Sequence, residues 1–195
     1  MGIVSLRGRT VVFLGKRGVG KSSTLNYLFG FNRPTDAAVE STVKPYAQTV
    51  RSAAGKRYRI VDMPGIAADI DSYGRYGRYY RRWVRSADTV IWITQSNVGA
   101  YKQDQIFFRD YSCFARPATR LVLALSKADK QVANLSDLTS PEMPEYDLIR
   151  RKAKDASSQI LPFTWADPES VTVVPYSIVK RWNTENLRSA ILAIP

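Results

Sequence analysis

The sequence contains no histidine and a single cysteine, Cys113, among its 195 residues. A zinc site built from cysteine and histidine is therefore excluded, and so is a catalytic Ser-His-Asp triad. A disulfide within the chain is excluded as well, because it needs two cysteines. Cysteine-poor chains are typical of reducing compartments, and we expect a cytoplasmic protein.

Long apolar runs are also absent. No stretch reaches the roughly 18 unbroken apolar residues that a membrane-spanning helix needs, and residues 1–9 lack the apolar centre of a secretion signal. Acidic residues are scarce, because 17 Asp and Glu face 29 Lys and Arg, which gives a formal charge of +12. A strongly basic chain attracts RNA, DNA, anionic lipid or a ribosomal surface, although charge alone is equally consistent with simple solubility.

Short apolar runs rich in β-branched residues alternate with segments of helical periodicity, the pattern of an α/β protein. We expect one domain over residues 1–195, a three-layer sandwich with a six-stranded, mostly parallel sheet and one antiparallel edge strand. The hairpin turn at residues 53–56 produces the antiparallel pair, and the polar segment 132–145 reads as a loop. The expected strands are 10–14, 42–51, 57–61, 88–94, 120–125 and 171–174, and the expected helices are 21–29, 71–86, 103–114, 146–160 and 184–194.

A phosphate-binding motif lies between the first expected strand and the first expected helix. Gly15, Gly20, Lys21 and Ser22 match the pattern G-x-x-x-x-G-K-[ST]. Glycines let the backbone curl so that several N–H groups point at one anion, and the helix adds its positive N-terminal end. A chance match in a glycine-rich turn is disfavoured by this strand-to-helix context. The residues predicted to cradle the phosphates are Gly15, Arg17, Gly18, Val19, Gly20, Lys21, Ser22 and Ser23.

A second motif, Asp62-Met63-Pro64-Gly65, follows the strand at residues 57–61. Asp62 ends that strand, which places it beside the phosphate loop at the carboxyl edge of the sheet. We expect Asp62 and the Ser22 hydroxyl to hold Mg²⁺, and Gly65 to offer its backbone N–H to the γ-phosphate. Asp-x-Pro-Gly is also an ordinary turn sequence, and the interpretation depends on its pairing with the upstream loop.

Together these segments resemble the Era-like small GTPase domains of the translation-factor-type (TRAFAC) P-loop GTPases, including small bacterial members. Their signature is an ordered series of motifs, and the resemblance covers essentially the whole chain. The first and third motifs are the two segments described above. The second is a threonine in a loop, matched by Thr42, with Thr35 as the alternative; the fourth is Ser126-Lys127-Ala128-Asp129, and the fifth is Ser177-Ile178.

The resemblance implies a P-loop NTPase fold that binds GTP and GDP with Mg²⁺. It assigns the metal to Ser22, Thr42 and Asp62, and catalysis to Lys21, Thr42 and Gly65. Asp129 would accept hydrogen bonds from guanine N1 and N2, Lys127 would lie along the base, and backbone N–H groups near Ser177 and Ile178 would approach guanine O6. Pairing donors with acceptors in this way discriminates strongly between bases.

Several positions depart from the family pattern. Ser126 replaces the usual asparagine, so we expect an orienting contact to be lost, and Ile178 is bulkier than the usual alanine. Ile66 follows Gly65, where Ras-type enzymes orient water with glutamine, and Gly18 replaces the potassium-binding asparagine of some relatives. Arg17 either supplies charge to the γ-phosphate or faces solvent. We therefore expect slow hydrolysis that a partner or a nucleotide-dependent homodimer accelerates.

Two rival functions share the same phosphate loop. One is a GTP-binding assembly module with little hydrolysis, which Ile66 and Gly18 keep open. The other is an ATP-dependent P-loop enzyme such as a kinase. The segment from Ser126 to Asp129 argues against it, and no separate acceptor-substrate domain is evident.

The expected helix at residues 71–86 carries an arginine stripe. Its members recur every three or four residues, while the aromatic residues gather mainly on the other side. An ordinary solvated face looks the same. The functional alternative is a nucleotide-controlled surface that binds RNA or the ribosome, with an anionic membrane as the competitor. The arginines are Arg75, Arg78, Arg82 and Arg85, and the aromatic residues are Tyr76, Tyr79, Tyr80 and Trp83.

Overall fold

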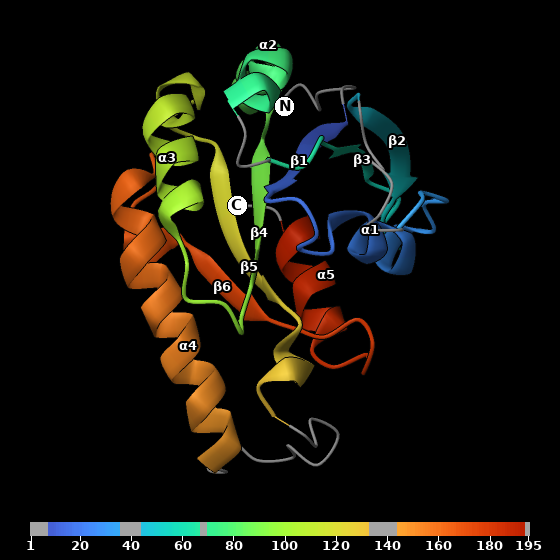
Figure 1. Cartoon of the computed structure of the whole chain (residues 1–195). Helices are drawn as coiled ribbons and strands as arrows, with labels where there is room; N and C mark the ends of the chain where they lie inside the picture. The colour runs from blue at the N-terminus through green and yellow to red at the C-terminus, as the bar shows by residue number, and fades with distance from the viewer. Residues whose placement is uncertain (1–7, 36–43, 67–69, 133–143, 194–195) are drawn as a thin grey trace.

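A six-stranded sheet forms the centre of the protein in the computed structural model, which describes residues 8–35, 44–66, 70–132 and 144–193 (Figure 1). The spatial order of the strands is β2-β3-β1-β4-β5-β6. The strands are β1 (Arg9–Gly15), β2 (Tyr46–Arg51), β3 (Arg57–Asp62), β4 (Thr89–Gln95), β5 (Arg120–Ser126) and β6 (Thr172–Pro175). The helices are α1 (Lys21–Phe29), α2 (Ile70–Ser86), α3 (Lys102–Tyr111), α4 (Pro144–Ile160) and α5 (Thr184–Leu192).

Strand pairing confirms the predicted sheet. β1 pairs in parallel with both β3 and β4, and β5 continues the parallel ladder to β6. β2 is an edge strand and is antiparallel to β3. The turn between them closes through the N–H of Gly55, which donates to Ser52 O at 2.9 Å with Gly55 at φ 75°. The predicted hairpin is therefore present.

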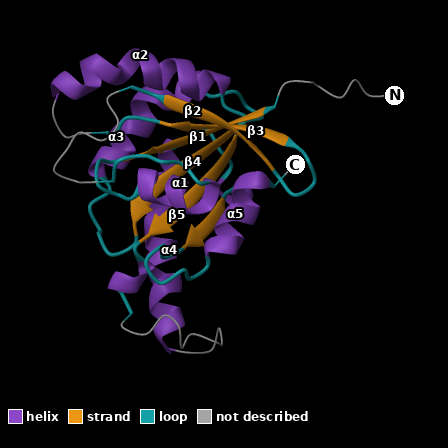
Figure 2. Cartoon of the chain, turned by 90° about the vertical axis from the view of Figure 1, so that its right-hand side faces the viewer, coloured by secondary structure: helices purple, strands orange, loops and turns teal. Residues whose placement is uncertain are grey.

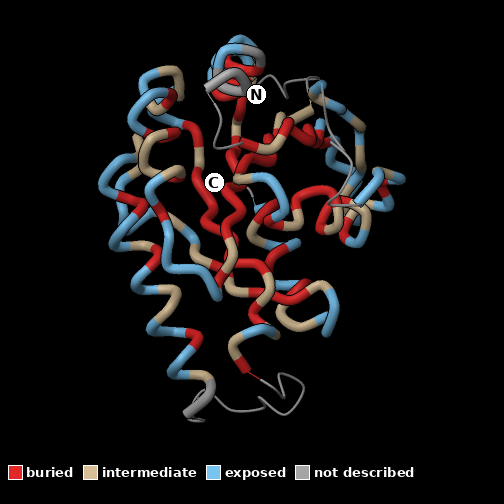
Figure 3. The backbone as a smooth tube through the Cα atoms, in the orientation of Figure 1, coloured by how far each residue is buried: buried red, intermediate tan, exposed pale blue. Residues whose placement is uncertain are grey.

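Helices cover both faces of the sheet, so the fold has three layers (Figures 1 and 2). On one face α2, α3 and α4 pack against Val12, Trp92 and Leu123, and on the other face α1 and α5 pack against Phe13 and Val122. Buried backbone runs through the strands between the two helical layers (Figure 3). Because both faces are covered, all but one terminal residue of β4 and of β5 is buried, and the centre of each strand is apolar, as is usual for parallel strands.

Aromatic rings fill the core under α2 and α3. Trp92 of β4 lies 4.4 Å from Phe108 and 4.9 Å from Phe107, measured between ring centroids. Tyr80 of α2 meets Phe107 edge to face at 5.3 Å. Rings of this size each bury a large apolar area, so this cluster fixes α2 and α3 on the sheet.

Several element bounds differ from the sequence-based expectation. β2 begins at Tyr46 and not at residue 42, because Pro45 has no N–H to donate to the ladder. The helix expected over 103–114 ends at Tyr111 and continues as a short 3₁₀ turn, Ser112–Phe114. α4 begins at Pro144, a residue well suited to a first helical turn. Most of the polar segment 132–145 lies outside the described residues.

In the part of the chain that the structure describes, every helix is too short or too polar to cross a membrane.

Candidate functional site

The loop from Gly15 to Ser22 turns tightly between β1 and α1. Gly15 has φ 144°, and a Cβ atom there would lie only 2.1 Å from the carbonyl oxygen of Ile93. Only glycine fits this position, because the backbone of β4 passes directly beside it. Gly20, which precedes the helix, has φ 98°, a conformation that other residues rarely adopt.

Lys21 lies inside the curl of this loop. Its side chain is 7 % exposed, and Nζ donates to Gly15 O at 3.0 Å and to Lys16 O at 2.8 Å. Burial lowers the pKa of Lys21 to about 8, although the Asp62 carboxylate partly opposes the shift. An ammonium group desolvated in this way gains strongly from an anion placed next to it.

Ser22 and Asp62 meet at the start of α1. The Ser22 hydroxyl donates to Asp62 Oδ2 at 3.0 Å, and Asp62 is fully buried at the end of β3. Asp62 pairs with Phe13 across β3 and β1, and this register places Asp62 beside the loop that ends at Ser22. A hydroxyl and a carboxylate are oxygen donors that suit Mg²⁺, so this end of the site fits the metal. Thr42 lies outside the described residues, and Thr35 is exposed.

The other end of the site follows β5 and β6. Ser177 Oγ donates to Asp129 Oδ1 at 2.5 Å and accepts a bond from the N–H of Lys180 at 3.1 Å. Lys127 has φ 59°, and its Nζ donates to Gly18 O at 2.9 Å, which ties this segment to the phosphate loop. Burial lowers the pKa of Lys127, while Asp129 acts in the opposite direction.

Ser126 corrects one expectation from the sequence. Although shorter than asparagine, its hydroxyl donates to Val19 O at 2.7 Å and reaches Thr94 O at 3.2 Å. β5 carries Ser126 close enough to the loop for the short side chain to reach it. The expectation that Ser126 loses its orienting contact is therefore wrong, because the serine still binds the phosphate loop. Ile178 is partly buried and packs against the core under α1 and α5.

The segment after β3 is bonded to the phosphate loop. Ile66 N donates to Gly15 O at 3.2 Å, and Arg17 N donates to Ile66 O at 3.0 Å. A Cβ atom on Gly65 would lie 2.9 Å from Arg17 Cα, so the contact depends on glycine. Ile66 itself is buried and offers no polar group to a water molecule.

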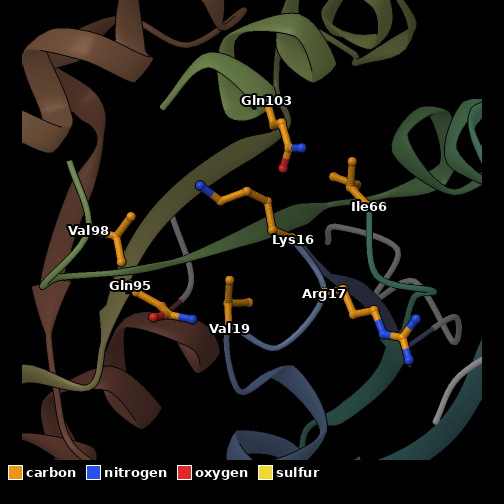
Figure 4. Close-up of a pocket in the computed structure, with 7 residues that line it drawn as sticks. All are labelled: Lys16, Arg17, Val19, Ile66, Gln95, Val98 and Gln103. Carbon is orange, nitrogen blue, oxygen red and sulfur yellow. The ribbon is translucent and has the colours of Figure 1, made fainter. Parts of the chain in front are cut away.

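A pocket of about 240 Å³ opens beside these two segments. Lys16 and Arg17 are neighbours in the loop but point in different directions, as Figure 4 shows. The pocket is lined by Lys16, Arg17, Val19, Ile66, Gln95, Val98 and Gln103.

Sequence reasoning missed two side chains near the loop. Asp104 of α3 is fully buried and pairs with Lys16 Nζ at 2.8 Å, and it also accepts a bond from Trp92 Nε1 at 2.9 Å. Arg33 Nε lies 3.8 Å from Asp62 Oδ2. An acidic residue three positions before Phe-Phe on an apolar helix face was the one available signal for Asp104.

The predicted binding segments meet at one edge of the sheet, because each follows the carboxyl end of a parallel strand. Residues 10–139 match the family model described as "50S ribosome-binding GTPase". The chain belongs to this family. It is 32 % identical over 143 residues to tRNA modification GTPase MnmE from Geotalea uraniireducens, covering 73 % of this chain and 30 % of MnmE. The chain thus spans about a third of the length of such curated relatives.

Solved structures share the fold. Era in complex with MgGDPNP and nucleotides 1506–1542 of 16S ribosomal RNA has a TM-score of 0.64 at 18 % identity, covering 97 % of this chain and 59 % of Era. A structure of the chloroplast translocon GTPases atToc33 and psToc159, for which dimerization is important for GTPase activity, has a TM-score of 0.66 at 19 % identity, covering 94 % of this chain and 81 % of that chain. These structures share the fold, and the family match over residues 10–139 confirms the resemblance inferred from the motifs.

Proposed function

We propose that this chain is a GTP-dependent molecular switch that binds GTP and GDP with Mg²⁺ and hydrolyses GTP slowly when isolated. The proposal rests on two parts of one site that lie at the same edge of the sheet: the phosphate loop and the segment that carries Asp129. The glycine loop with buried Lys21 provides a phosphate cradle, and Ser177 holds Asp129 at the opposite end. Lys127 links the two through Gly18 O.

The chain's own residues would divide the phosphate chemistry as follows. Lys21 would leave the carbonyl groups of the loop and bind the β- and γ-phosphates, and the loop N–H groups would orient them. Ser22, Asp62 and Thr42 would hold the metal. When bound, Mg²⁺ supplies positive charge that neutralises charge developing on the phosphates. Gly65 would bring its N–H to the γ-phosphate, since the following residue is already bonded to the loop.

Guanine selectivity would rest on Asp129. A carboxylate accepts hydrogen bonds and cannot donate them when ionised, so it matches the N1 and N2 donors of guanine and not the acceptor N1 of adenine. The bond from Ser177 fixes which carboxylate oxygen remains available. A backbone N–H near Ser177 and Ile178 would pair with guanine O6.

Slow hydrolysis follows from what surrounds the γ-phosphate position. Ile66 is apolar and buried, and Gly18 carries no side chain that binds a monovalent cation. Arg17 is exposed on the loop. We expect GTP to persist on the order of minutes to hours, as it does on unassisted GTPases. A partner, or a second copy of the chain, would accelerate turnover.

Calorimetric titration with GDP, GTP and ATP in Mg²⁺ tests the binding half of the proposal. Tight binding of both guanine nucleotides with little affinity for ATP is the expected result, and equal affinity for ATP would sink the assignment of Asp129. Single-turnover hydrolysis across protein concentrations tests the other half. Activity per molecule that rises with concentration indicates homodimer activation, and binding without turnover at any concentration indicates an assembly module.

A second candidate role, docking on RNA or the ribosome, is favoured by the basic surface over β2, β3 and α2. Arg59 of β3 and Arg82 of α2 stack on Trp83, at 4.9 and 5.7 Å from the ring centroid, so strand and helix share one surface. Among the described side chains of these elements, Asp62 is the only carboxylate, and it is buried. The exposed cationic residues are Arg51, Lys56, Arg57, Arg59, Arg78, Arg81, Arg82 and Arg85.

The structure describes three of the four arginines in the predicted stripe, Arg78, Arg82 and Arg85, and all three are exposed. Tyr76 and Tyr80 are buried against the sheet, whereas Tyr79 and Trp83 are only partly buried. The side chain of Arg75 lies outside the described residues. An anionic membrane remains the competing partner of this surface.

A further inference from the structure

Arg33 places a positive charge at the metal end of the candidate site. Its Nε lies 3.8 Å from Asp62 Oδ2, the same oxygen that accepts the hydrogen bond from Ser22. The Arg33 side chain is only 20 % exposed, and Asp62 is 0 % exposed. The guanidinium group therefore faces the carboxylate from a largely desolvated position, where charges interact more strongly than in water.

The backbone of Arg33 is held while its side chain extends. Asn26 of α1 binds both sides of the residue, with Nδ2 donating to Arg33 O at 2.8 Å and Oδ1 accepting from Arg33 N at 3.0 Å. These two bonds anchor the segment after α1 to the helix that begins the phosphate site. The side chain can then change rotamer without moving its anchor.

Tyr46 provides a second contact for the guanidinium group. The Arg33 Cζ atom lies 4.6 Å from the centroid of the Tyr46 ring, a cation–π distance. Tyr46 opens β2 and pairs with Asp62 across the antiparallel ladder. The guanidinium thus contacts the ring of Tyr46 and the carboxylate of Asp62, two residues that are directly opposite each other in the sheet.

We propose that Arg33 is a resident cation that competes with Mg²⁺ for Asp62, so that metal loading displaces the Arg33 side chain. This proposal rests on the proposed function, because it concerns the same nucleotide site. Ser22 and Arg33 converge on one oxygen of the carboxylate, and a divalent cation near that oxygen would repel the guanidinium. Contact with Tyr46 keeps the displaced side chain near β2, so metal occupancy would change the surroundings of Arg33 and Tyr46.

An arginine that only binds nucleotide phosphate would behave in the opposite way. Its removal would weaken GDP binding in the absence of metal, without lowering the Mg²⁺ concentration that the complex needs. The relative positions favour competition, because Arg33 Nε lies 3.8 Å from the carboxylate oxygen that would hold the metal. The two roles are separated by a metal titration.

The experiment measures the affinity of the full chain for a fluorescent GDP analogue from EDTA to millimolar MgCl₂. We expect Arg33→Gln to lower the Mg²⁺ midpoint about fivefold, the factor that corresponds to about 1 kcal/mol of competition from the guanidinium group. Arg33→Lys retains the charge and should stay nearer the wild-type midpoint. The readout is binding, so hydrolysis does not enter it.

Arg151→Gln is the matched control, since it makes the same charge change far from the candidate site. Arg151 is exposed on α4, which packs beside β6 at the edge of the sheet opposite β2. It should leave the midpoint unchanged. A thermal melt of each variant checks that it is folded.

The possible outcomes separate this inference from the proposed function. If GDP fails to bind wild-type protein at every Mg²⁺ concentration, the proposed function is wrong. If GDP binds but Arg33→Gln leaves the midpoint unchanged or raises it, only the competition is wrong. An equal shift of the Mg²⁺ midpoint in Arg151→Gln would also overturn the competition, because the effect would then follow from net charge.

Discussion

Lys16 Nζ lies 2.8 Å from Asp104 Oδ2, and this ion pair joins the phosphate loop to the first turn of α3. Asp104 is fully buried and Lys16 is 16 % exposed. Lys16 also donates to Ala100 O at 2.8 Å, and Trp92 donates to the second carboxylate oxygen of Asp104. The loop is therefore fixed from the side of α3 as well as by its own backbone.

We expect Asp104→Asn to destabilise the protein by about 3 kcal/mol, since removing one partner leaves the other charge poorly compensated. The amide can still accept from Trp92, so the substitution tests the charge and not the volume. Urea unfolding gives the free energy. Asp110→Asn on the same helix is the control, because Asp110 is 38 % exposed and pairs with the neighbouring Arg109. An equal loss in the free energy of unfolding for the two variants would contradict a stabilising role for the buried Lys16–Asp104 pair.

Local sequence patterns were sufficient to predict the three-layer arrangement, the antiparallel hairpin of β2 and β3, and the position of the glycine-rich loop between β1 and α1. The bounds of α1 were correct because Lys21 follows Gly20 and the helix ends before Gly30, which has φ 67°. The contacts Lys16–Asp104 and Arg33–Asp62 could not be predicted, because they join residues far apart in the sequence. Their formation depends on the distance between packed elements, which periodicity does not determine.

Site residues fall into the same two classes. Gly15, Lys21 and Ser22 could be predicted as site residues because a phosphate loop demands glycine, a cation and a hydroxyl within one short segment, and their roles stay predictions. The reach of Ser126 to the loop was missed, since its side-chain length suggested a loss while the approach of β5 compensates. Thr42 lies outside the described residues, and its role stays a prediction.

Ser177→Ala should weaken GDP binding about tenfold, because one hydrogen bond to a charged group contributes about 1.5 kcal/mol. The lost bond is the one that Ser177 Oγ donates to Asp129. ATP affinity should not fall in parallel, so guanine selectivity decreases. Calorimetry with both nucleotides measures it. Ser158→Ala, which removes an exposed hydroxyl bonded within α4, is the control; a parallel loss of ATP and GDP affinity in Ser177→Ala would argue against selective positioning of Asp129.

The stability of the nucleotide-free protein should depend on pH through Lys21. Its pKa is about 8 in the folded chain and 10.5 in the reference state. Between these values the unfolded chain holds a proton that the folded chain lacks, so the free energy of unfolding rises with pH. Below pH 8 the cost of burying the charged ammonium is fully present.

Lys21→Met isolates this effect from other titrating groups. The free energy of unfolding of wild type minus that of Lys21→Met should increase from pH 8 to pH 10, as measured by urea denaturation at fixed ionic strength. Lys102→Met, on the exposed side of α3, serves as the control. A difference that stays flat from pH 7 to pH 10 would show that Lys21 is not desolvated in solution.

The basic surface over α2 should bind RNA in a salt-dependent manner. Neutralising a phosphate contact changes the slope of log affinity against log salt by about 0.7 to 0.9. The triple variant Arg78→Gln, Arg82→Gln, Arg85→Gln should therefore reduce the slope by about 2 to 3 if each side chain meets one phosphate. Anisotropy of a labelled structured RNA between low and moderate KCl concentrations measures the slope.

The matched control for this surface removes the same charge from α4. Arg150, Arg151 and Lys154 are exposed there, and their replacement by Gln should leave the slope near the wild-type value. Equal losses in the two triple variants would mean that net charge, and not the surface over α2, attracts the RNA. Flotation with anionic liposomes tests the remaining alternative, an anionic membrane. Both ligands present phosphate groups, but only vesicles present a bilayer. Binding to vesicles without binding to RNA would therefore assign this surface to a membrane.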